Sequence, residues 1–227
     1  MSFKKFVKSL SEGDVEKELV RDIFLSLVFS AIVFAIFYYF KLRLIENFMP
    51  KYGAYIIMAI ISYSFIIPVV KQVKSYKTFP CMSGMMIGMT LGMVAGFLSG
   101  YYVGATNGMF WGSVFGMLIG IIIGIWSGSC CGIMGMMEGI MAGFMGGLMG
   151  AMTAVMMLND NMLVGGLIML IICGIILTML SYMVYIESRE KERQQKDNII
   201  FTVGLSLLLS AITIVMIIFG PRSVLFS

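Results

Sequence analysis

The sequence contains no histidine, and acidic and basic residues together make up only 12% of its 227 residues. Histidine is the commonest general base in enzymes and a usual zinc ligand, so its absence argues against both roles. The apolar segments hold no pair of carboxylates, and no phosphate-binding loop occurs. Basic residues do not form a patch interleaved with aromatic ones, which excludes a nucleic-acid partner. We therefore expect a protein that is not an enzyme.

Apolar residues, by contrast, make up 59% of the chain and fall in long blocks. A helix needs about 20 such residues to cross the hydrocarbon core of a bilayer. Seven blocks fit that length, at 23–40, 52–70, 84–102, 109–127, 135–158, 162–186 and 199–220. Lipid offers no hydrogen bonds to the backbone, so these blocks predict helices. The expected fold class is all-α, a polytopic membrane protein with about seven transmembrane helices in the lipid bilayer.

The distribution of lysine and arginine predicts the orientation of the chain. With the N-terminus in the cytoplasm, inner segments carry twelve of these residues and outer segments carry four. Basic loops stay on the cytoplasmic side, so we expect the N-terminus inside and the C-terminus outside. We predict an integral protein of the plasma membrane of a prokaryote.

The chain divides into four segments by composition. Residues 1–22 mix charged and apolar residues and predict a cytoplasmic amphipathic segment, and residues 23–80 and 163–227 each predict two transmembrane helices. Residues 81–162 contain 17 of the 24 methionines and 19 of the 26 glycines, with no lysine or arginine. The turns inside this segment are short, so its three helices should be antiparallel neighbours.

Glycine recurs at every fourth position from Gly84 to Gly132, and again from Gly135 to Gly147. Small residues at this spacing let helices approach closely in a membrane, where little hydrophobic force drives association. This glycine ladder predicts a tightly packed three-helix unit and could also support a homo-oligomer. The stretch "GMVAGFLSG" at 92–100 resembles "GIMAGFMGG" at 139–147, which suggests a duplicated helix on the two sides of the middle one.

Methionines form two rows at helical spacing within this unit. One row is Met85, Met89 and Met93, and the other is Met137, Met141 and Met145, with Met134 one turn before it. One interpretation is that flexible methionine fills gaps beside glycine. The other is that the thioethers bind a soft monovalent ion, Cu(I) above all, because neutral sulfur ligands select it over hard cations.

Three cysteines and one acid add to the candidate metal site. Cys81, Cys130 and Cys131 should converge at the cytoplasmic end, where thiols stay reduced and can capture a metal or sense redox state. The alternative is that Cys130 and Cys131 are simply small residues in a tight turn. Glu138 is the only acidic or basic residue within the seven blocks, so it could balance a cation or carry a proton. It could also reach water at the inner interface.

The stretch "MMIGM", followed by glycine at four-residue spacing, resembles the MxxxM and GxxxG signatures of CTR-type copper transporters. The resemblance implies that Met85, Met89 and Met93 match the methionine motif of that family and that copper is the cargo. Members of the family have three helices and form trimers around the methionine row, whereas seven helices are expected here. The vicinal cysteines resemble those of bacterial mercury transporters.

These features lead to a main hypothesis and two alternatives. The main one is a membrane permease or channel for a soft metal ion, Cu(I), passed along methionine thioethers to the cysteines, with no other cofactor. The first alternative is a non-enzymatic assembly or structural protein whose glycine ladder packs partner helices or oligomerises. The second is a transporter of another solute, gated around Glu138.

Overall fold

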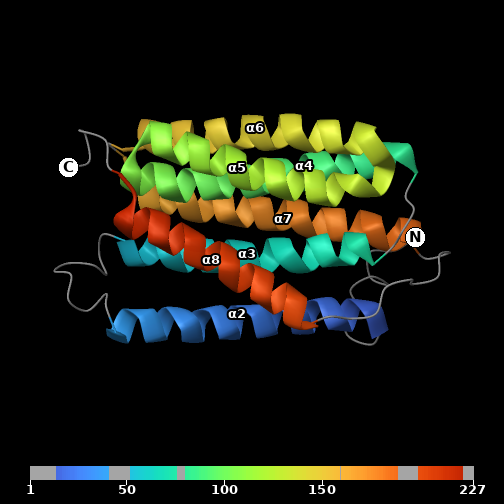
Figure 1. Cartoon of the computed structure of the whole chain (residues 1–227), viewed down its shortest axis with the longest axis horizontal. Helices are drawn as coiled ribbons and strands as arrows, with labels where there is room; N and C mark the ends of the chain where they lie inside the picture. Colours follow the sequence, from blue (N-terminus) through green and yellow to red (C-terminus); the bar gives the residue numbers. More distant parts are fainter. Residues whose placement is uncertain (1–13, 41–51, 76–79, 159, 189–198, 222–227) are drawn as a thin grey trace.

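A computed structural model describes residues 14–40, 52–75, 80–158, 160–188 and 199–221, and every regular element in these ranges is a helix. Figure 1 shows the helices lying side by side, with α8 crossing its neighbours obliquely. Residues 1–13 of the predicted amphipathic segment lie outside the described residues. The all-helical fold class predicted from the apolar blocks is confirmed for the described ranges.

The helices follow one another along the chain with short connections in the glycine-rich region. They are α2 (Asp14–Phe40), α3 (Ala54–Lys74), α4 (Cys81–Asn107), α5 (Met109–Gly128), the 3-10 helix η3 (Ser129–Cys131), α6 (Gly132–Met156), α7 (Met162–Ser188) and α8 (Ile199–Phe219). Residues 14–22, predicted to be separate from the first apolar block, are continuous with it in α2. Their glutamates, lysine and arginine are good helix formers, so the helix need not end where the charges begin.

Judged by length and composition, four stretches of the described residues are candidate membrane spans: Ala54–Lys74, Met82–Asn107, Met109–Met156 and Met162–Glu187. The chain is therefore an integral membrane protein with about four spans on this criterion, not the seven predicted. The third stretch, of 48 residues, combines α5 and α6, which turn back on each other at η3. The described apolar part of α8 is shorter, at Val203–Phe219, and α2 is charged over residues 14–22.

Helices α4, α5 and α6 form the predicted three-helix unit on one side of the molecule, and α2 lies on the opposite side (Figure 1). Their glycines meet in layers, each with one glycine from each helix. A Cβ on Gly120 would lie 2.8 Å from the Cα of Gly96 and 2.9 Å from that of Gly143, closer than real side chains approach. The layers are Gly88, Gly128 and Gly135; Gly92, Gly124 and Gly139; Gly96, Gly120 and Gly143; and Gly100, Gly116 and Gly147.

The two similar stretches at 92–100 and 139–147 occupy equivalent places in these layers. Gly92 lies against Gly139, and Gly96 lies against Gly143, so the two helices run parallel with the sequence match in register. The expectation that they flank α5 on separate sides is wrong in one respect, because α4 and α6 also contact each other directly. Three glycine rows can meet on one axis, which explains the triangular arrangement.

The face of α4 that packs toward α3 and α7 uses large side chains instead. Ile87, Leu91, Tyr101 and Tyr102 are all fully buried. The Tyr102 hydroxyl lies 2.6 Å from Ser62 Oγ of α3, and Tyr101 donates a hydrogen bond of 2.6 Å to the carbonyl of Met162, where α7 begins. Helix α4 thus joins a glycine interface on one side to a conventional apolar interface on the other.

Candidate functional site

The cysteines at the turn between α5 and α6 lie against the first turn of α4. Cys131 Sγ is 3.9 Å from Cys130 Sγ and 3.7 Å from the Pro80 carbonyl oxygen, and it lies over Gly84. The structure therefore brings η3 and the start of α4 together. Cys81 is the first residue of α4, and its side chain lies outside the described part of the chain.

A lysine stands beside this turn. Lys74, in the last turn of α3, places its Nζ 4.8 Å from the centre of the Trp126 ring in α5, a cation–π contact. Its charge acts on the nearby Cys130. A cation near this turn repels a metal cation, so the turn does not favour a multiply charged ion.

Both methionine rows lie on the outer surface of the three-helix unit, away from its axis. Met89 and Met93 of α4 are 48% and 37% exposed, and Met85 is partly exposed. Met137, Met141 and Met145 of α6 are about three-fifths exposed, as is Met134 near its start. We call Met85, Met89, Met93, Met137, Met141 and Met145 together the methionine face.

Glu138, the residue after Met137 in α6, lies at the level of Met85 of α4. Gly146 of α6 packs against the backbone of Met93 of α4. Because the two helices run parallel in register, residues eight positions earlier on each also lie at one level, and these are Glu138 and Met85. Glu138 is partly exposed, so its carboxylate stands beside thioethers on a surface that is otherwise apolar.

The axis of the three-helix unit is closed. At Gly96 a Cβ would lie 2.8 Å from the Gly143 carbonyl oxygen, and at Gly116 it would lie 2.7 Å from the Cα of Gly100. Backbones this close leave no space for an ion between them. An ion therefore cannot pass along this axis.

Within the described residues, no group of three or more histidine, cysteine, aspartate or glutamate side chains could hold a metal ion. A site on the methionine face would therefore depend on thioether sulfur, with Glu138 as its one carboxylate. The glycines of the ladder, apart from Gly132, are already in close contact within one chain. Their packing against one another therefore needs no partner helix.

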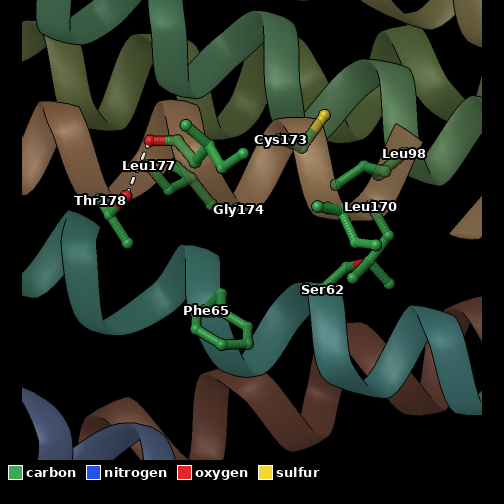
Figure 2. Close-up of a pocket in the computed structure, with 10 residues that line it drawn as sticks. Ser62, Phe65, Leu98, Leu170, Cys173, Gly174, Leu177 and Thr178 are labelled. Carbon is green, nitrogen blue, oxygen red and sulfur yellow. Dashed lines mark hydrogen bonds between the residues drawn. The ribbon is translucent and has the colours of Figure 1, made fainter. Parts of the chain in front are cut away.

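A cavity of about 280 Å³ lies between α3, α4 and α7, as Figure 2 shows. Phe65, Leu98, Leu170 and Leu177 contribute to its apolar lining, and Cys173 of α7 also borders it. Its hydroxyls are already bonded, Thr178 donating 2.8 Å to the Ile175 carbonyl and Ser62 donating 2.8 Å to that of Met58. The free thiol of Cys173 is thus the one side-chain group of the lining that an ion could use.

Sequence analysis missed an ion pair at the η3 end of the bundle. Asp22 of α2 accepts a hydrogen bond from Lys71 of α3, and only 3% of the Asp22 side chain is exposed. Asp22 is the residue just before the first apolar block, so it was assigned to the cytoplasmic segment. The signal that could have found it is the spacing of Asp22, Ser26 and Ser30, which places three polar residues on one face of the helix.

Comparisons with protein families, with curated proteins and with solved structures find no match to this chain. The function must therefore be argued from the chain itself.

Proposed function

We propose that this protein carries a soft monovalent metal ion, Cu(I), across the membrane over the methionine face. We further propose that α2, α5, α6 and α8 each cross the membrane. Together with α3, α4 and α7 they make seven crossings, with the N-terminus inside. The observation that supports the proposal is that both methionine rows are exposed on the outside of the three-helix unit, with Glu138 at the level of Met85.

The methionine face differs from the other lipid-facing surfaces of the molecule. On α7 the exposed large side chains are leucine, isoleucine and valine, with Met179 as an exception. On α4 all the exposed large side chains are methionines. Filler in gaps is expected to be buried, but these thioethers point outward, where they are accessible to an ion. Neutral sulfur ligands at successive turns bind Cu(I) weakly enough to pass it on.

We propose that a second copy of the chain covers the methionine face. A carboxylate such as Glu138 is costly in lipid, and a metal route needs ligands on both sides. The methionine faces of two or more copies would supply ligands on both sides of the route and would cover Glu138. The homo-oligomer is thus proposed to form through methionine, because the glycines are used within each chain.

Uptake of Cu(I) into proteoliposomes, followed with an enclosed copper-sensitive dye, tests the proposal. Met89→Leu with Met141→Leu should lower the initial rate at least on the order of tenfold, since even outer-shell partners of a metal contribute that much. Leucine preserves volume, so the fold should persist. Met179→Leu is the matched control, because Met179 is equally exposed but lies on α7. Equal rates in all three proteins would refute the metal route.

A further inference from the structure

Polar side chains gather where α2, α3, α4 and α8 meet, on the side of the molecule away from the methionine face. Helix α2 packs on α3 and α8, and α8 also packs on α4. On α2 the buried polar residues are Asp22, Ser26 and Ser30, and on α8 they are Ser206, Ser210 and Thr213, each no more than 4% exposed. On α3 and α4, which pack against these helices, the buried polar residues include Tyr63, Ser64, Ser99 and Asn107. We call these ten residues the polar row.

Several atoms of the polar row are buried without any hydrogen bond. They are Asp22 Oδ1, Ser26 Oγ, the Tyr63 hydroxyl, Ser64 Oγ and Asn107 Oδ1. All five residues are at most 2% exposed. Lipid cannot satisfy such groups, so leaving them unbonded in a membrane is costly. Their number on adjoining helices indicates a site for something that forms hydrogen bonds.

Helix α3 adds a backbone group to the row. Pro68 lies inside this helix and has no N–H, so the carbonyl of Ser64, four residues earlier, loses its helical donor. The Ser64 hydroxyl is itself unpartnered. One residue in the middle of the helix thus presents two free acceptors.

The polar row extends along most of the bundle. The contact of Lys71 with Asp22 fixes α2 and α3 at the η3 end. Seven residues back along α3 is Ser64, about 10 Å deeper at 1.5 Å per residue. At the opposite end Asn107 of α4 donates a hydrogen bond to the Met216 carbonyl of α8. Between these ends, the Tyr63 hydroxyl has Ser99 and Thr213 as neighbours.

Among the described residues, two basic side chains lie near Asp22. Lys71 is its partner from α3, and Arg21, its neighbour on α2, has its Nε 4.0 Å away. Helix α8 contains no acidic or basic residue. Asp22 is therefore the one carboxylate of the polar row, and Lys71 is the group that responds when its charge changes.

We propose that the polar row is a proton passage, with Asp22 as the group that takes up and releases the proton. A water held by the unpartnered groups passes a proton to the Asp22 carboxylate, so that its own O–H bond breaks as the carboxyl O–H bond forms and Lys71 is freed. That water regains a proton from the next water of the row. The carboxyl O–H bond breaks when the proton passes to water at the η3 end and the ion pair forms again. No electron is exchanged. The passage and the metal route share α4 but have no residue in common, so either can fail alone.

Proton flux into metal-free proteoliposomes, read with an enclosed pH-sensitive dye under a potassium diffusion potential, tests the passage. The wild type should conduct faster than protein-free liposomes. Asp22→Asn should return the rate to the protein-free level, and Ser64→Ala should lower it. Ser127→Ala is the control, because Ser127 is equally buried but lies on α5. A wild type no faster than liposomes, or an Asp22→Asn variant equal to wild type, would overturn the proposal.

Thiol accessibility gives a second test if Asp22→Asn fails to fold. In membranes, Ser64→Cys should react with a water-soluble, membrane-impermeant thiol reagent above the labelling of the native cysteines. Ile66→Cys, on the same helix and fully buried among apolar residues, should not. Failure of Ser64→Cys to react shows that water does not enter the row and rejects the passage.

Discussion

Cys131 occupies the position where the glycine row of α6 would continue toward η3, four residues before Gly135. It lies over Gly84, whose missing side chain leaves the space for its sulfur. The short turn at residues 128–131 was enough to predict that the two vicinal cysteines lie near the start of α4. Their place at the end of the glycine rows was not predicted, because the step of three from Gly132 to Gly135 interrupts the ladder.

The glycines of the ladder differ from other helical glycines in the space that is available for an added methyl group. Gly96→Ala places a Cβ 2.8 Å from a backbone oxygen of α6, which cannot move independently. We expect a loss of stability on the order of 1–3 kcal/mol from overpacking. Thermal unfolding in detergent measures it.

Gly174→Ala is the matched control for that substitution. Gly174 lies in α7, and nothing is within 4 Å of a Cβ built there. Alanine should leave stability unchanged or raise it by up to about 1 kcal/mol, because it favours the helix. If the two variants unfolded at the same temperature, the close contact of the three backbones would be disproved.

Among the elements, the arrangement of α4, α5 and α6 was largely predictable. Short turns require consecutive helices to pack side by side, and the four-residue spacing of glycine indicates which faces are in contact. The outward direction of the methionines also follows from residue spacing. On α6, Met141 and Met145 come two residues after Gly139 and Gly143, about 200° around the helix. Once glycine faces the axis, methionine must face away from it. This outward direction was not predicted from the sequence.

Pro68, inside helix α3, leads to a further prediction. Pro68→Ala supplies an N–H to the Ser64 carbonyl and should stabilise the protein by up to about 3 kcal/mol, the difference between these residues inside a helix. The same change removes an acceptor from the polar row, so proton flux should fall while the melting temperature rises. Thermal unfolding and the proteoliposome assay on one preparation measure both. A lower melting temperature would show that Pro68 is needed for the packing of α3.

For the whole molecule, composition predicted a helical membrane protein but could not predict how the outer helices meet. Serines and threonines scattered through the apolar blocks of α2 and α8 look unremarkable along the chain. They become a polar row only when α8 crosses α2 and α3 (Figure 1). Asp22 was missed for the same reason, because burial of a residue at the edge of an apolar block depends on which helix covers it.

The molecule thus has two separate regions, a glycine-packed unit with an outward methionine face and a polar row among the peripheral helices. The central claim is that the methionine face binds Cu(I). The most direct measurement is the copper content of the purified protein after loading with Cu(I), with X-ray absorption to identify the ligands. We predict bound copper with sulfur neighbours, lost when Met89, Met141 and Met145 are replaced by leucine and kept in Met179→Leu. Copper absent from the wild type, or retained by the triple variant, would contradict the claim.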